Sequence, residues 1–474
     1  MQACLSGTTN YSTLTFYFIF EVEPVIRPPV SAPTRLTPSE RQAFDKLEKA
    51  IATNAYHDSQ ARSTFPGCLP GTRKEQIKKI MNWIEAKGSK KPLFVVLGPA
   101  GSGKSSLLWT VAQICKDKGF YAAGFFLSSK DLERTTSALF ITTIAYQISE
   151  AIPELRPYVS RAVEAEGSIL SRSLKTQLNS LLLRPLSQLQ ADHPGFSFRP
   201  RVIAIDALDE CGNENDQIQA ISALTEALSS PSFPFLCLFS SRFNLHIENL
   251  LSHKLTRRLV HDRVELGTNV GAEKDDILAY LYANAQRIRD EHPFRLRIPQ
   301  DWPAKSDLEA VVERSGGQFI YAATVIRYIE SDHKPHDRLR DILHMSSSKS
   351  GTNPFAPLDD LYRVLMSSLK DLKTAVEILS IELVSSNAQF WSPVTLEWNC
   401  FYEDHFGSLD ADMVLAPLAS LLKYENRRIK FYHLCFAEFL LDATRSGEFF
   451  VHPVKWQTWI VSRLVRYFYD DRGV

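Results

Sequence analysis

The chain has 474 residues, of which 44% are hydrophobic and 23% are charged, a composition that indicates a globular protein of two or three domains. Lysine plus arginine and aspartate plus glutamate number 54 each, so no net charge points to nucleic acid or a membrane surface as a partner. Seven scattered cysteines without a C-x-x-C pair argue against a zinc site or a disulfide framework and favour a reducing compartment. No window approaches about 18 uninterrupted apolar residues. We therefore expect a cytoplasmic protein without a membrane span.

The first 92 residues are predicted to lead into the main domain. Residues 1–40 hold five prolines between positions 24 and 38, which predicts a disordered segment. Residues 41–92 are predicted to form a helical linker, with one helix from Ser39 to about Asn54 and a second over 73–87. Thr72 is the expected N-cap of the second helix, because a glutamate follows three residues later.

A phosphate-binding loop pattern, G-x-x-x-x-G-K-[ST], occupies residues 98–105, directly after the apolar run Leu93–Leu97. Glycines let such a loop turn back on itself with its N–H groups pointing inward, and the N-terminus of the following helix favours negative charge. Lys104 is expected to reach the terminal phosphates, and the Ser105 hydroxyl to bind Mg²⁺. The residues predicted to bind the nucleotide here are Gly98, Pro99, Ala100, Gly101, Ser102, Gly103, Lys104, Ser105 and Ser106.

Alternating strands and helices predict a single P-loop NTPase domain over 93–266, an α/β fold with a parallel sheet flanked by helices. After the loop we expect a helix over Ser105–Lys118, a strand over Tyr121–Leu127 and a helix from about Thr135 to Ile152.

The second diagnostic stretch is the apolar strand Val202–Ile205, which ends in Asp206. Because the carboxyl ends of parallel strands meet at one edge of the sheet, Asp206 is predicted to be the Mg²⁺ partner beside the loop. Asp209 or Glu210 is predicted to act as a base that positions water. The alternative is that these two acids only begin a surface turn.

A third predicted strand, Phe235–Phe239, is followed closely by Arg242. Strand ends on this edge face the ligand, so Arg242 is predicted to sense or stabilise the terminal phosphate. The alternative is that Arg242 only forms a surface ion pair.

Helical spacing dominates the rest of the chain. Residues 267–345 are predicted to form a small helical domain, with one helix over Glu273–Arg289 and two within Ser306–Glu330 that are joined at two glycines. Residues 346–357, rich in Ser, Gly and Pro, are the predicted linker, and 358–474 hold further helices and a short extended piece.

This order of motifs resembles the NACHT-type members of the STAND class of P-loop NTPases, especially fungal NACHT proteins with a nephrocystin-type NTPase module. The resemblance covers about residues 40–450 and implies that a helical domain and a winged-helix domain follow the NTPase domain. It rests on GPAGSGKSS at 98–106, VIAIDALDEC at 202–211, LFSSR at 238–242, GGQFIYAATVIRYI at 316–329 and FYHLCFAEFLLD at 431–442.

The resemblance implies roles for two more residues. The segment CLPGTR at 68–73 is similar to the family's segment before the NTPase, which would place Arg73 near the bound base. In the family's winged helix, the histidine of an F-x-H-L-x-F-x-E-F pattern contacts the β-phosphate of ADP and holds the closed form, and here that histidine is His433. Without the resemblance, a single histidine beside an apolar helix is usually a core residue.

The function implied by the resemblance is a nucleotide-operated signalling switch, of the kind used in innate-immunity-like and programmed cell death signalling. ADP would hold a closed form, ATP with Mg²⁺ would favour an open form that self-associates, and slow hydrolysis would reset the protein. The alternatives are an AAA-like turnover ATPase and a degenerate nucleotide-binding scaffold. The sequence leaves GTP open beside ATP and ADP, and it identifies neither the activating signal nor the protein partners.

Family members usually carry an N-terminal effector and a C-terminal repeat sensor. The chain instead starts with the proline-containing segment and stops soon after the predicted winged helix. The sequence leaves open whether this difference reflects a truncated gene product.

Overall fold

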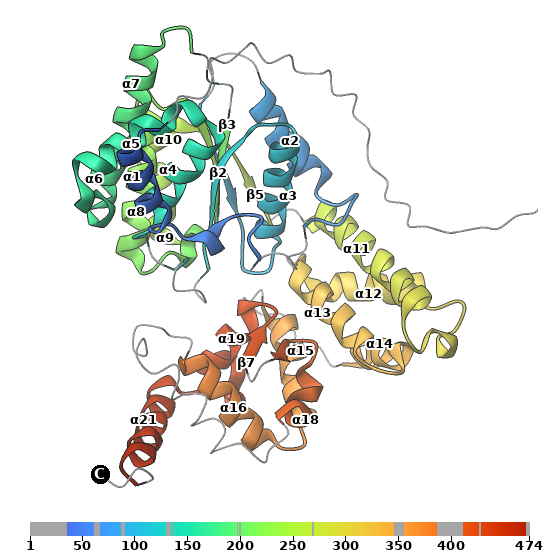
Figure 1. The fold of residues 1–474 in the computed structure, drawn as a ribbon. Helices are drawn as coiled ribbons and strands as arrows, with labels where there is room; N and C mark the ends of the chain where they lie inside the picture. The colour runs from blue at the N-terminus through green and yellow to red at the C-terminus, as the bar shows by residue number, and fades with distance from the viewer. Residues whose placement is uncertain are drawn as a thin grey trace, which may run out of the picture. The chain divides into compact units, whose positions relative to one another are not determined.

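A computed structural model of the chain is drawn in Figure 1. The residues that it describes are 36–60, 67–86, 91–128, 134–135, 137–196, 198, 201–267, 270–345, 355–385, 411–425 and 428–470. The predicted disordered segment up to residue 35 and most of the predicted linker at 346–357 lie outside the described residues.

A five-stranded parallel sheet organises the first half of the described chain, as predicted. The strand order is β2-β3-β4-β1-β5, so the strand before the phosphate loop lies inside the sheet. The strands are β1 (Leu93–Leu97), β2 (Tyr121–Phe126), β3 (Arg201–Asp206), β4 (Phe235–Ser241) and β5 (Val260–Glu265). Every residue of β1 and β4 is buried, as expected for parallel strands with helices on both faces.

The two faces of the sheet contribute to different cores because side chains alternate along a strand. Leu93, Val95 and Leu97 of β1 enter one core, and Phe94 and Val96 enter the other. The first core is covered by α1 (Pro38–Glu48), α4 (Phe140–Ala151), α5 (Arg156–Ala165), α6 (Leu174–Leu178), α7 (Arg184–Asp192), α8 (Glu214–Ser229) and α9 (Leu245–Ser252), with α10 (Lys254–Leu259) at its margin. The second is covered by α2 (Lys74–Glu85) and α3 (Lys104–Asp117), on the opposite side of the sheet in Figure 1.

The C-terminal half is mostly helical and has a continuous apolar core of its own. Its first helices are α11 (Val270–Glu291), α12 (Lys305–Ser315), α13 (Phe319–Glu330) and α14 (Pro335–His344). They are followed by α15 (Ala356–Ser367), α16 (Leu372–Ser385), α18 (Ala411–Leu415), β6 (Leu422–Glu425), β7 (Arg428–Phe431), α19 (Leu434–Leu441), α20 (Ala443–Ser446) and α21 (Pro453–Asp470). Ala100 of the phosphate loop belongs to this same core, so the loop is packed against the C-terminal half.

Several predicted boundaries are confirmed and a few are wrong. The helix pair α12 and α13 is joined at Gly316 and Gly317, as predicted, and the structure shows that both glycines have positive φ. Thr72 is not an N-cap, because its hydroxyl donates to the Leu69 carbonyl and Arg73 takes the cap position with φ 55°. The first helix ends at Glu48 rather than near Asn54.

The antiparallel pair β6–β7 followed directly by α19 is the part of the chain where a winged helix was predicted. The winged-helix assignment and the domain boundaries stay predictions. In the described part of the chain no helix combines the length and the apolar character needed to cross a membrane.

Candidate phosphate-binding site

The phosphate-binding loop has the predicted setting, between the end of β1 and the start of α3. Gly101 and Gly103 have φ values of 75° and 89°, which residues with side chains rarely adopt. A Cβ on Gly98 would lie 2.7 Å from the Ser102 Oγ and 2.9 Å from the Leu266 carbonyl oxygen, so this position requires glycine as well. The glycines of the motif are therefore needed by the geometry of this loop.

Lys104 is fixed across the loop that precedes it. Its Nζ donates to the carbonyl oxygens of Gly98 at 2.8 Å and Pro99 at 2.9 Å. Burial lowers the pKa of Lys104, and the nearby carboxylates of Asp209 and Asp206 offset part of that effect. An anionic ligand at the loop would stabilise the charged form of this ammonium group.

Asp206 lies at the same edge of the sheet as the loop, as predicted. Ile205 pairs with Phe239 and Val96 pairs with Ser240, so the ends of β3, β4 and β1 are aligned. The Ser240 hydroxyl donates to Asp206 Oδ1 at 2.7 Å and accepts a hydrogen bond from the backbone N–H of Ala207 at 2.9 Å. Asp206 is only 1% exposed, and Ser240 orients its carboxylate.

Asp209 holds Arg242 in place. Its Oδ1 accepts the backbone N–H of Arg242 at 3.0 Å, and its Oδ2 lies 3.1 Å from Arg242 Nε. Of the two acids predicted as a base, Asp209 is thus engaged by the arginine. Glu210 is half-buried at the end of the same short turn, and the role of a base stays a prediction for both acids.

The guanidinium of Arg242 makes a second ion pair. Its Nη1 lies 2.6 Å from Glu438 Oε1 on α19. Arg242 therefore bonds both to Asp209, which follows β3, and to the C-terminal half, so it forms more than a surface ion pair. Its role at the terminal phosphate stays a prediction.

Arg73 is buried beneath the loop, with only 2% of its side chain exposed. Its Nη2 donates to the Ser102 carbonyl oxygen at 2.8 Å, and its Nη1 donates to Glu273 Oε1 at 2.9 Å. The guanidinium also lies 4.9 Å from the ring centroid of Phe319. These contacts make Arg73 a clamp on the backbone of the loop, whereas the resemblance implied a residue near the base.

Glu273 completes this clamp. Its Oε1 also accepts the N–H of Gly267 at 2.7 Å, so one carboxylate joins the segment after β5 to the arginine under the loop. Neither Glu273 nor Ser240 was identified from the sequence. A glutamate among other charged residues at a helix start, and a serine inside an apolar strand, carry no motif that marks them.

Helix α13 contacts the loop directly. The N–H of Ile320 donates to the Gly101 carbonyl oxygen at 3.1 Å. A Cβ on Gly101 would collide with Ile320 Cγ2, so the helix and the loop fit together only because residue 101 has no side chain.

His433 caps the start of α19. Its Nδ1 accepts the N–H of Cys435 at 3.1 Å, and the residue is half-buried. Cys435 and Lys104 are near enough for each to affect the pKa of the other. The start of α19 is therefore close to the phosphate-loop lysine, although His433 itself is placed by its bond within the helix.

The donor set at this edge fits a nucleotide with Mg²⁺. Ser105, in the first turn of α3, supplies a hydroxyl and Asp206 supplies a carboxylate, both of which are oxygen ligands that Mg²⁺ accepts when phosphates complete its shell. The buried Oγ of Ser102 has no hydrogen-bond partner among the residues described. A Cβ on Gly103 would meet nothing within 4 Å, so the backbone there faces open space.

The sheet order, the glycine-rich loop between β1 and α3, and the aspartate at the end of β3 together define the class: the chain has a P-loop NTPase fold. Residues 73–242 match the family model of the Nephrocystin 3 N-terminal region. This match spans Arg73, the loop, the acidic strand and Arg242, and agrees with the nephrocystin-type module implied by the sequence. No curated protein matches the chain.

Three solved structures illustrate what the chain is similar to. The Walker-type ATPase paby2304 of Pyrococcus abyssi has 14% identity and a TM-score of 0.38, over 79% of this chain and 97% of that one. Cdc6p from Pyrobaculum aerophilum has 11% identity and a TM-score of 0.36, over 85% and 96%. AMPPCP-bound DnaA from Aquifex aeolicus has 12% identity and a TM-score of 0.25, over 88% and 99%. The assignment of the fold rests on the sheet and the loop themselves.

Proposed function

We propose that the chain is a nucleotide-operated switch of the NACHT type. ADP binds in a closed form, ATP with Mg²⁺ favours an open form that self-associates, and slow hydrolysis returns the protein to the closed form. Each nucleotide shifts the equilibrium only by the difference in its affinity for the two forms. The signalling output belongs, on this proposal, to immunity-like or cell death pathways.

The proposed roles follow from the positions of the side chains. The backbone N–H groups of 98–106 surround the phosphates, and Lys104 contacts the terminal ones. Ser105 and Asp206 would hold Mg²⁺, which when bound polarises the phosphoryl oxygens and offsets their charge. Glu210 orients the attacking water, and Arg242 contacts the terminal phosphate.

The observation that carries the proposal is the direct bond between the loop and the C-terminal half. Ile320 on α13 donates to the Gly101 carbonyl oxygen, and Ala100 lies in the core of the C-terminal half. A scaffold that only binds nucleotide needs no such bond, whereas a switch needs the phosphate-binding residues to be coupled to the part that moves. A shift in the loop backbone upon binding phosphate would therefore change the packing of α13.

His433 has the proposed role of closing the site on ADP. Its position at the start of α19, near Lys104 through Cys435, supports a contact with the β-phosphate in the closed form. The His433→Ala variant should lose more affinity for ADP than for ATP.

The test is to purify the full chain, denature it and identify the nucleotide released. Tightly retained ADP supports the switch, with the Lys104→Ala variant as a control that should carry none. An empty site with rapid Mg²⁺-ATP turnover would instead indicate a turnover ATPase. An empty site without turnover would leave a scaffold, and either result would overturn the proposal.

A further inference from the structure

Arg242 lies between two carboxylates that come from different halves of the chain. Asp209 follows β3 and receives both the backbone N–H and the Nε of Arg242. Glu438 belongs to α19 and reaches Nη1 at 2.6 Å. The arginine is 28% exposed and Glu438 34% exposed, so this second pair is partly shielded from water.

The guanidinium is positioned at the phosphate edge. Arg242 directly follows Ser241, which pairs with Leu97, the last strand residue before the loop. Arg242 also lies close enough to Lys104 to lower its pKa. The two cations therefore face the same region, where the terminal phosphate of a bound nucleotide would lie.

We propose that Glu438 is a tethered substitute for the γ-phosphate. With a diphosphate bound, the Glu438 carboxylate occupies the outer face of the Arg242 guanidinium. With a triphosphate bound, the γ-phosphate competes for that face and displaces Glu438. Glu438 is thereby the residue that sets the preference between ADP and ATP, and the inference rests on the proposed function.

The two anions exclude one another for electrostatic reasons. A guanidinium binds a carboxylate or a phosphate through the same planar fork of N–H donors, and the Nε of Arg242 is already paired with Asp209. Placing a γ-phosphate beside Glu438 would bring like charges together in a partly dry site, where their repulsion is stronger than in water. Asp209 stays bound in both states because it also holds the backbone of Arg242.

Loss of the Glu438 bond has a mechanical consequence. Glu438 lies on α19, five residues after His433, and α19 belongs to the core of the C-terminal half. Release of Glu438 removes an ion pair between that helix and the sheet edge. A bound γ-phosphate thereby removes one of the contacts that hold α19 to the edge of the sheet.

The experiment compares the full chain with its Glu438→Gln variant, which keeps the shape of the side chain and removes the charge. Affinities for Mg²⁺-ADP and for the non-hydrolysable Mg²⁺-AMPPCP are measured by calorimetry after removal of bound nucleotide. The variant should bind AMPPCP about tenfold more tightly relative to ADP, within the usual range of coupling between sites. Glu448→Gln, at an exposed position that follows α20, is the matched control and should leave the ratio unchanged.

A double-mutant cycle tests whether the effect runs through Arg242. In an Arg242→Ala background, the change Glu438→Gln should no longer alter the ratio of the two affinities. Should Glu438→Gln fail to fold, Glu438→Asp withdraws the carboxylate and should shift the ratio in the same direction.

Two results overturn the inference and are distinguishable. An equal change in both affinities, or an unchanged ratio, removes Glu438 from nucleotide discrimination while the switch itself stands. Binding of neither nucleotide by the unmodified chain overturns the proposed function and the inference together.

Discussion

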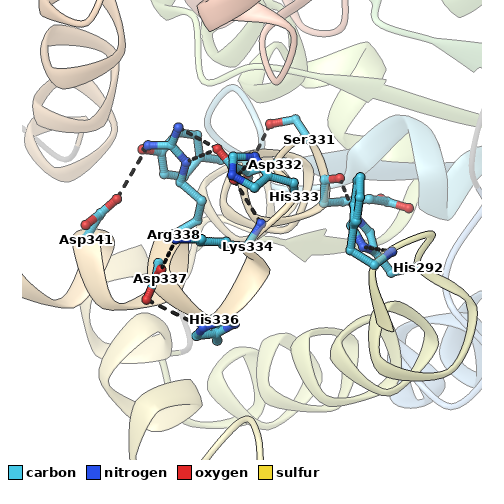
Figure 2. A network of polar contacts seen from close by, with 12 residues as sticks. His292, Ser331, Asp332, His333, Lys334, His336, Asp337, Arg338 and Asp341 are labelled. Atoms are coloured by element: carbon cyan, nitrogen blue, oxygen red, sulfur yellow. Dashed lines mark hydrogen bonds and ion pairs between the residues drawn. The ribbon is translucent and has the colours of Figure 1, made fainter. Parts of the chain in front are cut away.

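Two arginine–carboxylate pairs in the molecule have similar bond lengths and different surroundings. Arg73 meets Glu273 at 2.9 Å, and the two side chains are 2% and 3% exposed. Arg338 meets Asp332 at 2.6 Å, with 38% and 16% exposure. Figure 2 shows this second pair within a network of polar side chains around the turn between α13 and α14, where Arg338 also reaches Asp341.

The comparison teaches that bond length alone does not identify an important ion pair. A buried charge that loses its partner stays in a medium that solvates it poorly, whereas an exposed charge that loses its partner is solvated by water. The two pairs also bond to different backbones. Arg73 holds the Ser102 carbonyl of the phosphate loop, and Asp332 holds the N–H of Lys334 before α14. Only the first pair should affect nucleotide binding.

The largest effect is expected for Arg73→Met. This change leaves Glu273 charged and buried, which should lower the free energy of unfolding by about 3–5 kcal/mol. It also frees the Ser102 carbonyl, so retained nucleotide should be lost. Urea unfolding and nucleotide release measure the two effects.

A second substitution separates the loss of stability from the loss of nucleotide binding. Adding Glu273→Gln to Arg73→Met removes the unpaired charge and should restore most of the stability, while nucleotide retention stays low. A loss of less than about 1 kcal/mol for Arg73→Met alone would place this pair with the exposed ones.

The next effect is expected for Gly101→Ala, compared with Gly103→Ala. Both residues have positive φ, so each alanine should cost about 1–3 kcal/mol in backbone strain. Only the alanine at 101 also collides with Ile320 on α13. Thermal unfolding should show a clearly larger loss for Gly101→Ala, part of which Ile320→Ala recovers. Equal losses at both glycines would show that α13 does not pack against the loop in solution.

A smaller effect is expected from pH through the buried Lys104. Burial lowers the pKa of Lys104 below its ordinary 10.5 in the free protein, and bound phosphate would raise it. Nucleotide affinity should be full below the free-state pKa and should decrease as pH rises through it. Calorimetry in buffers of different ionisation enthalpy should detect proton uptake upon binding on the alkaline side. Affinity that is constant up to the ordinary lysine pKa would contradict this expectation.

The smallest effect is expected for Arg338→Met. The free energy of unfolding should fall by at most about 1 kcal/mol, because Arg338 is exposed and Asp332 partly exposed, so water replaces the lost partner. Nucleotide retention should equal that of the unmodified chain. A loss as large as that of Arg73→Met would remove the distinction between the two pairs.

Much of the fold and part of the site could be predicted from the sequence, because those features are local. Short continuous stretches of sequence determine the loop, the strand that ends in Asp206 and the glycine pair before α13. Strand β5 lies at the edge of the sheet and was not identified, since four of its six residues are polar and neither an apolar run nor an alternation marks it.

The contacts that tie the site together were beyond sequence reasoning for a different reason. Arg73 and Glu273 are 200 residues apart, and Arg242 and Glu438 nearly as far. Their meeting depends on how the C-terminal half packs, which no short pattern encodes. Asp209 and Glu210 are adjacent and chemically alike, so the sequence alone could not show that Asp209 forms the ion pair with Arg242.

The burial of Cys435 has a practical consequence. This free thiol lies in α19 with no exposed surface, and burial raises its pKa to about 12. It is therefore protected from alkylating reagents both by inaccessibility and by being almost wholly protonated near neutrality. A conformational change that separates α19 from its neighbours would expose the Cys435 thiol. Alkylation of Cys435, detected by mass spectrometry, would therefore report this change without an engineered label.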